Sequence, residues 1–267
     1  MNRRAIGKSD LPRLLGLWCD CFSEKEETAK LFFERNLSDT HGYLAEENGA
    51  PIAAVYLVGC TLCGKPAHYL CGAATRREYR GRGVMTDLID FALRDAQRRG
   101  DCYSVLLPAS EGLYRFYGRM GYVPCGAVCR KTLTTDGGKP VDRAGEPDWE
   151  ALQQRCHKDK FLLWNKNYIR FAAAYYACYG VTVLQNAHVF ALLEQNGAAA
   201  DVFYAVYDSI EELKYTLSAA GVRRFTLTGC SEAPLFSGCE VQRCGMAKSL
   251  QGGCELPGRV FIGLTLN

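Results

Sequence analysis

The sequence is most constrained by a turn rich in glycine and arginine, residues 76–83 (RREYRGRG), which lies between a strand pattern and a helix pattern. Residues 68–75 (HYLCGAAT) are apolar enough for a strand, and residues 84–99 are predicted to form an amphipathic helix. Apolar side chains repeat at helical spacing on one face of that helix: Met85, Leu88, Ile89, Ala92 and Ala96. The pattern therefore predicts a strand, a tight turn and a long helix in direct succession.

The chemistry of this turn indicates an anion-binding site. Gly81 and Gly83 remove side chains where the backbone must approach a ligand closely. The amides of residues 81–86 point off the start of the helix, where unpaired N–H groups attract negative charge. Four arginines add positive charge around them: Arg76, Arg77, Arg80 and Arg82. A pyrophosphate would fit there, and the alternative is a glycine-kinked junction with a solvated arginine face.

Two common phosphate-binding motifs do not match this turn. The ATP-binding loop ends in Gly-Lys-Ser/Thr, whereas Gly83 is followed by Val84. The dinucleotide-binding fingerprint requires a third glycine and an acidic residue after the next strand. The turn therefore belongs to a different class of phosphate-binding loop.

Two segments carry a resemblance to a known superfamily. Residues 80–85 (RGRGVM) resemble the Q/R-x-x-G-x-G/A loop of the GNAT superfamily of N-acetyltransferases, with Met85 in place of a small residue. Residues 110–122 (SEGLYRFYGRMGY) resemble its second signature, N-x-x-A-x-x-F-Y-x-x-x-G-F, with Ser110 in place of the asparagine. The signatures occur in the right order with one helix and one strand between them, so the combination is specific.

The resemblance implies an acyl-CoA N-acyltransferase fold, a mixed α/β sheet, with acetyl-CoA as co-substrate. The pyrophosphate would lie on the amides of residues 81–86, and the pantetheine arm would pair with the edge of strand 73–75. An amide of that strand would stabilise the oxyanion. The implied cofactor-binding residues are Ala73, Ala74, Thr75, Arg80, Gly81, Arg82, Gly83, Val84, Met85, Thr86, Ser110 and Glu111.

The resemblance also implies a catalytic acid. Tyr117 matches the position of the superfamily's acid and would protonate the departing thiolate. The alternative is that Tyr117 is a core aromatic, in which case Tyr114 is the fallback donor. The general base stays open among Glu46, Glu47 and His68, each of which also fits a plain surface role.

The second half is predicted to repeat the first. Residues 135–148 (TDGGKPVDRAGEPD) carry glycine, proline and charge, and indicate a linker between domains 1–135 and 149–267. Each half contains a hairpin, a strand, a helix and a strand. In the second half, strand 199–207 passes into helix 210–220 through Asp208-Ser209, with an aspartate where a phosphate would lie. The second unit is therefore not expected to bind the same cofactor.

This tandem arrangement is similar to the N-terminal and central domains of the enhanced intracellular survival protein family. Ser110-Glu111-Gly112 and residues 117–122 (YGRMGY) resemble that family's versions, as does an arginine-rich loop without the final glycine. Members often carry a third, sterol-carrier-like domain, for which this chain is expected to be too short. In that family the terminal carboxylate enters the site, which raises the same question for Asn267.

Composition excludes several classes. No run of about 18 apolar residues occurs and residues 1–10 lack an apolar segment, so neither a membrane span nor a signal peptide is expected. A net charge of +3 is too small to imply nucleic acid. The 14 cysteines are expected to be reduced thiols in a cytoplasmic protein. Cys60 and Cys63 form a C-x-x-C, but no second one completes a zinc site, so no metal is expected.

Other elements follow from local patterns. Ser23 with Glu26 predicts a capping box at the start of a second helix. Residues 121–134 are predicted to be the last strands of the first unit, and residues 260–266 a final strand. Residues 161–178 are predicted to be a helix that is apolar nearly all round, buried either between the two halves or within the second domain.

Three functions remain open. The first is an N-acetyltransferase that moves an acetyl group to a small-molecule or peptide primary amine by direct attack in a ternary complex. The second is a non-catalytic CoA-binding regulatory module, and the third is an interaction protein without a cofactor. No nucleic-acid or membrane partner is expected, a homo-oligomer stays open, and the acceptor has no readable motif.

Overall fold

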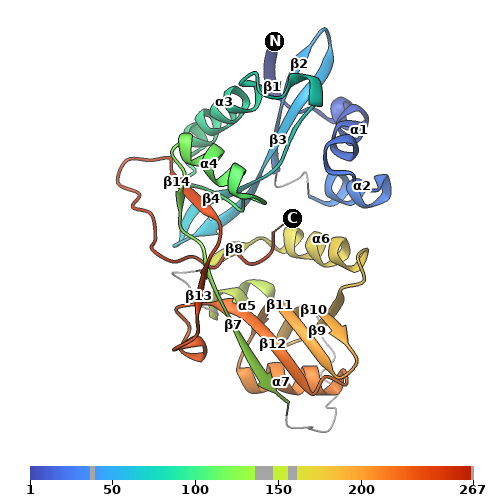
Figure 1. Cartoon of the computed structure of the whole chain (residues 1–267), viewed down its shortest axis with the longest axis vertical. Helices are drawn as coiled ribbons and strands as arrows, with labels where there is room; N and C mark the ends of the chain where they lie inside the picture. The colour runs from blue at the N-terminus through green and yellow to red at the C-terminus, as the bar shows by residue number, and fades with distance from the viewer. Residues whose placement is uncertain (37–39, 136–146, 156–160, 266–267) are drawn as a thin grey trace.

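The computed structural model describes residues 1–36, 40–135, 147–155 and 161–265. Two mixed β-sheets lie one above the other, with helices on their faces (Figure 1). The helices are α1 (Leu11–Phe22), α2 (Glu26–Arg35), α3 (Val84–Arg99), α4 (Glu111–Arg119), α5 (Trp149–Arg155), α6 (Lys166–Ala177) and α7 (Ile210–Ala219). The strands are β1 (Asn2–Ala5), β2 (Thr40–Glu47), β3 (Ala50–Leu62), β4 (Lys65–Thr75), β5 (Tyr103–Leu106), β6 (Val123–Pro124), β7 (Ala127–Thr134), β8 (Leu162–Trp164), β9 (Thr182–Asn186), β10 (Val189–Asn196), β11 (Ala199–Tyr207), β12 (Arg224–Cys230), β13 (Val241–Arg243) and β14 (Met246–Ser249).

The first sheet has the strand order β1-β2-β3-β4-β5-β14-β6, and β8 pairs with the end of β3. β4 and β5 are parallel, and α3 connects them across one face, whereas α1 and α2 cover the other (Figure 1). Alternate residues of β3 therefore face two cores. Val55 belongs to the core under α3, which includes Leu88. Tyr56 faces the other core, with ring centroids 5.7 Å from Trp18 and 5.0 Å from Phe32.

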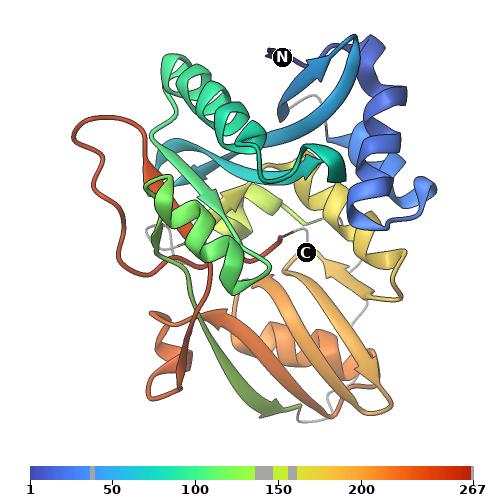
Figure 2. The same ribbon diagram turned by 45° about the horizontal axis from the view of Figure 1, so that its top comes forward.

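The second sheet has the order β13-β7-β12-β11-β10-β9. β11 and β12 are parallel and are connected by α7, which repeats the β4–α3–β5 arrangement. α6 lies between the two sheets in both views (Figures 1 and 2), and its Phe171 ring lies 5.6 Å from Phe32 of α2. The predicted mixed α/β fold with two related units is confirmed.

The two sheets exchange strands. β7 follows β6 in the sequence but pairs with β12 in the second sheet, and β14 pairs with β5 and β6 in the first. The prediction that residues 121–134 complete the first unit is therefore wrong for β7. The reason is that β7 pairs with β12, which lies far along the chain, and this pairing buries Cys129 of β7 and Phe225 of β12. A local sequence pattern contains no information about such a distant partner. The division into domains 1–135 and 149–267 stays a prediction, and strands are shared across it.

Gly126 lies where the two crossing segments meet, and a side chain there is expected to destabilise the fold. An added Cβ would lie 1.5 Å from the carbonyl oxygen of Cys244. The Cys244 amide donates to the Gly126 carbonyl at 2.9 Å, so the two backbones cannot separate without losing this bond. We expect Gly126→Ala to lower the free energy of unfolding by about 3 kcal/mol, measured by urea denaturation.

A matched variant tests that reasoning. Gly16 in α1 has nothing within 4 Å of an added Cβ. Gly16→Ala should therefore raise stability by about 0.5–1 kcal/mol through helix propensity. A Gly126→Ala protein as stable as the parent would contradict the close approach.

Residues 161–178 form a strand and a helix, which corrects the single predicted helix. Residues 162–164 pair with residues 60–62 of β3 as β8, because a short apolar run satisfies strand and helix patterns alike. Asn165 then starts α6, and its side chain accepts a hydrogen bond from the Tyr168 amide at 2.7 Å. The predicted strand 260–266 is also wrong: Val260 and Phe261 form isolated bridges only. The predicted linker, apart from its ends, and Asn267 lie outside the described residues.

The link between α1 and α2 differs from the predicted capping box. Ser23 ends α1 in the left-handed conformation, with φ of +54°, and its amide donates to the Cys19 carbonyl at 2.9 Å. Lys25 precedes α2 without a capping hydrogen bond from its side chain. Ser23 therefore closes the first helix and turns the chain sharply into the second.

Candidate functional site

The glycine- and arginine-rich turn forms an open helix N-terminus. β4 ends at Thr75, a short 3-10 turn covers residues 77–79, and α3 begins at Val84. Gly81 and Gly83 have φ of +74° and +77°, a conformation that favours glycine. In neither residue would an added Cβ have a described atom within 4 Å. The first amides of α3 therefore face open space in front of the helix, as the predicted anion site requires.

The arginines of the turn are held in place by defined contacts. The Nε of Arg80 donates to the Thr75 carbonyl at 2.9 Å, which braces the turn against the end of β4. The Nε of Arg76 donates to the Pro51 carbonyl at 2.9 Å. The Arg82 guanidinium lies 5.5 Å from the ring centroid of Tyr79. Contacts therefore hold three of the four arginines of the turn in defined positions just before α3.

The end of β4 next to the turn is only partly paired. β4 pairs with β5 from Ala67 to Tyr69, and no pairing between them continues beyond Tyr69 in the described strands. On its other side, β4 is bulged, because Gly72 and Ala73 together face one residue of β3. Gly72 has φ of +59°, and its added Cβ would lie 2.5 Å from the Trp18 ring. Beyond Tyr69, the end of β4 therefore pairs with β3 alone in the described strands.

A cavity of about 470 Å³ joins the turn, the end of β4 and the helix α4. Ten residues singled out from the sequence line it: Ala73, Ala74, Thr75, Arg80, Gly81, Gly83, Val84, Met85, Thr86 and Tyr117. Arg82, Ser110 and Glu111 do not line it, and Ser110 instead caps α4 by accepting from the Leu113 amide at 3.4 Å. The lining also includes Cys21 and Phe22, which no sequence motif indicated.

Of the two tyrosines considered as the acid, Tyr117 is the one that lines the cavity. Its side chain is 6% exposed and packs edge-to-face against Phe116 and Tyr122. Burial raises the pKa of Tyr117 to about 12, so the phenol keeps its proton at neutral pH. Its hydroxyl makes no hydrogen bond to another residue in the described part of the chain. The hydroxyl is therefore available as a proton donor to a ligand.

Tyr114 is placed differently, although it lies on the same helix. It does not line the cavity, and its hydroxyl accepts a hydrogen bond from the Gly245 amide at 2.9 Å. This contact ties α4 to the segment that leads into β14. The structure thus separates the two tyrosines that the sequence left as alternatives.

None of the three candidate bases is part of the described cavity lining. The carboxylate of Glu46 pairs with Arg4 at 3.0 Å, and Glu47 accepts a hydrogen bond from the Tyr79 hydroxyl at 2.8 Å. His68 lies near the other end of β4. The described lining therefore offers the amine no carboxylate or imidazole as a base.

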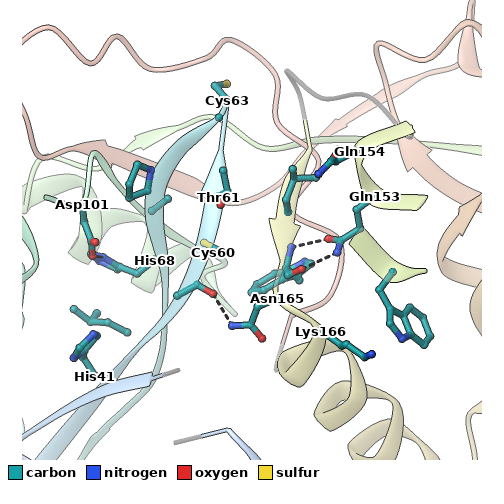
Figure 3. Close-up of a pocket in the computed structure, with 18 of the residues that line it drawn as sticks. His41, Cys60, Thr61, Cys63, His68, Asp101, Gln153, Gln154, Asn165 and Lys166 are labelled. Atoms are coloured by element: carbon teal, nitrogen blue, oxygen red, sulfur yellow. Dashed lines mark hydrogen bonds and ion pairs between the residues drawn. The ribbon is translucent and has the colours of Figure 1, made fainter. Parts of the chain in front are cut away.

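A larger cavity, about 1120 Å³, lies near the start of β4 (Figure 3). His68 and Asp101 lie on one side, with His68 Nδ1 2.7 Å from the Asp101 carboxylate. Burial lowers the pKa of His68, so its ring is neutral near pH 7. On the other side, the side-chain amide of Asn165 donates to the Gly59 carbonyl at 3.3 Å. The glycine- and arginine-rich turn does not contribute to this cavity, so we place the candidate site in the smaller one.

The corresponding junction of the second unit is built differently. β11 passes into α7 through Asp208 and Ser209, and the Ser209 side chain caps the helix by accepting from the Glu212 amide at 3.2 Å. The Asp208 carboxylate lies 2.7 Å from His188 Nδ1. An aspartate in contact with His188 therefore stands between β11 and α7, where the first unit has its glycine turn between β4 and α3.

The described residues contain neither a metal-binding cluster nor a membrane-spanning helix. No group of three or more His, Cys, Asp or Glu side chains in that part of the chain could hold a metal ion. None of its helices is both long and apolar enough to cross a membrane.

Comparisons with known proteins agree with the motifs. Residues 2–125 match the sequence model of a family described as an acetyltransferase (GNAT) domain. No curated protein matches the chain in sequence. The family match covers both signatures, the turn and α4, and so includes the candidate site.

Solved structures share the fold over nearly the whole chain. A probable N-acyltransferase from Enterococcus faecalis V583 is 16% identical, with a TM-score of 0.73, over 95% of this chain and 74% of that protein. Eis1 from Mycobacterium abscessus is 14% identical, with a TM-score of 0.67, over 94% of this chain and 73% of that protein. A tandem GNAT protein from the clavulanic acid biosynthesis pathway is 14% identical, with a TM-score of 0.53, over 94% of this chain and 99% of that protein. Residues 2–125 therefore match the GNAT acetyltransferase family, and the chain as a whole shares the fold of tandem GNAT proteins.

Proposed function

We propose that the protein is an acetyl-CoA-dependent N-acetyltransferase that acts on a primary amine in a ternary complex. The observation that carries this proposal is the single cavity that joins the open helix N-terminus, the end of β4 beyond its pairing with β5, and Tyr117. The pyrophosphate of CoA binds the amides at the start of α3, and the arginines of the turn neutralise its charge. The pantetheine arm pairs with residues 73–75 as an added strand would.

The transfer itself needs one nucleophile, one oxyanion donor and one acid. The neutral amine attacks the thioester carbonyl carbon and forms a C–N bond, while the carbonyl oxygen becomes an oxyanion. An amide at the bulged end of β4 donates to that oxygen. The C–S bond then breaks, Tyr117 gives its proton to the thiolate, and the amine nitrogen releases a proton to solvent, from which the Tyr117 phenolate takes one back. Because the described lining contains no base, the amine must enter in its neutral form.

Turnover of acetyl-CoA tests the proposal. The chain is incubated with acetyl-CoA and a panel of primary amines, and release of free CoA thiol is followed together with the acetylated product. Binding of CoA without any turnover would favour the regulatory module. Absence of CoA binding by calorimetry would favour an interaction protein without a cofactor.

The number of CoA molecules bound per chain is a separate prediction. We expect one, because the first unit has an open helix N-terminus and the second has Asp208 at the equivalent place. Calorimetric titration with CoA measures this stoichiometry directly. Two equivalent sites per chain would contradict the distinction between the two units.

A further inference from the structure

The cavity carries an apolar wall that the CoA loop does not explain. Phe22 and Leu113 line it and are 44% and 38% exposed, although large apolar side chains are seldom so exposed in the described chain. Phe22 ends α1 and Leu113 lies in α4, so two separate elements contribute to the wall. Phe116 and Cys21 extend it. Exposed apolar side chains gathered around a cavity indicate a surface that a ligand covers.

The position of Phe22 assigns part of this wall to the acceptor. The Cys21 thiol donates to the Thr75 carbonyl at 3.5 Å, which holds the end of α1 against the last residue of β4. Under the proposed function, residues 73–75 hold the acyl end of acetyl-CoA. Phe22 follows Cys21 directly and lines the same cavity, so it lies beside the reacting group.

The charges around the cavity favour an acceptor with a single amine. Among the described residues of the lining, the charged ones are Arg80 and Arg119, and none is acidic. A carboxylate would be needed to compensate each further ammonium group of a polycation. Nearby positive charge also favours the neutral form of the attacking amine.

Contacts from the second unit hold Phe22 in place. Ser23 turns sharply after it, and Glu24 then accepts a hydrogen bond from the Trp18 indole N–H. The other carboxylate oxygen of Glu24 accepts from the Tyr179 hydroxyl at 2.8 Å, at the end of α6. Because these contacts hold the end of α1 in place before a ligand binds, binding at Phe22 carries little entropic cost for ordering that segment.

We propose, resting on the proposed function, that the acceptor is a primary amine that carries an apolar group and no second positive charge, and that Phe22 and Leu113 bind that group. Hexylamine and 2-phenylethylamine represent this class. Ethylamine lacks the apolar group, and spermidine adds positive charge.

The test measures kcat/KM for the four amines in the parent chain and in Phe22→Ala. We expect hexylamine and 2-phenylethylamine to exceed ethylamine and spermidine by at least about tenfold. Phe22→Ala should lower the hexylamine-to-ethylamine ratio of kcat/KM by about tenfold or more, and Phe22→Leu should restore most of it. Val241→Ala, which removes an equally exposed apolar side chain outside the cavity, should leave the ratio unchanged.

The outcomes separate this inference from the proposed function. Preference for spermidine, or an unchanged ratio in a Phe22→Ala protein that still binds CoA, would overturn the inference alone. Failure to acetylate any of the four amines, in a chain that binds CoA, would overturn both. Leu113→Ala gives a second, independent reading of the same ratio.

Discussion

Gly83→Asp is expected to weaken CoA binding by about a thousandfold or more while the protein stays folded. Gly83 has φ of +77°, a region that aspartate tolerates better than most side chains. No described atom lies within 4 Å of the added Cβ, so the substitution causes no internal clash. The new carboxylate lies at the start of α3, where the proposed pyrophosphate binds, and the two negative charges repel.

Gly83→Asn is the matched control for this prediction. It imposes the same backbone strain and nearly the same side-chain volume without the charge. Calorimetry of CoA binding should therefore show a much smaller loss for Gly83→Asn than for Gly83→Asp, with both proteins equally folded by circular dichroism. Equal CoA affinities for the parent and a folded Gly83→Asp protein would show that the turn does not bind the pyrophosphate.

Tyr117→Phe is expected to lower kcat by about a hundredfold to ten-thousandfold, with little change in the Kd of acetyl-CoA. The substitution keeps the ring and its packing against Phe116 and Tyr122. It removes only the hydroxyl, which the proposed reaction uses when the thiolate departs. Because a thiolate can leave without being protonated, we expect the loss of kcat to lie at the low end of this range.

The pH dependence of the parent enzyme gives a second reading of the same group. The acid must be protonated to act, and burial raises the pKa of Tyr117 to about 12. Loss of activity through deprotonation of Tyr117 should therefore begin only as the pH approaches that value. Below that pH, activity should increase with rising pH as the amine substrate loses its proton.

Tyr114→Phe is the control on the same helix. Its hydroxyl accepts a hydrogen bond from the Gly245 amide, so its loss should cost about 1 kcal/mol of stability and leave kcat nearly unchanged. A large loss of kcat in Tyr114→Phe with none in Tyr117→Phe would exchange the two roles. If neither variant matters, the thiolate leaves without an acid, and Tyr117 is a core aromatic.

Local patterns predicted the parts of the protein whose structure is local. The helix predicted at residues 84–99 matches α3, and the glycines of the turn adopt positive φ as their placement required. Backbone hydrogen bonds within a helix and the φ preference of glycine act over a few residues, so a short stretch of sequence contains all the information they need. The two GNAT signatures lie in this local part, and with them the predicted anion site.

The sequence could not choose between alternatives that depend on distant neighbours. Tyr114 and Tyr117 lie on one short helix. Only the tertiary structure shows that the Tyr114 hydroxyl accepts a hydrogen bond from the distant Gly245 amide. Residues 161–164 fit a strand as well as a helix, and the free side of β3 decides for the strand. Cys21 and Phe22 carry no motif, because they line the cavity only through the packing of α1 against β3 and β4.

By itself, the sequence determined the glycine- and arginine-rich turn, the helix behind it and the match of residues 2–125 to the GNAT family. The tertiary structure alone decided the exchange of β7 and β14 between the sheets, the partly paired and bulged end of β4, and the apolar wall around Phe22. The physical reason is the range of the interactions. A turn and a helix are stabilised by near neighbours in the chain, whereas strand pairing and cavity walls depend on residues that fold together from far apart.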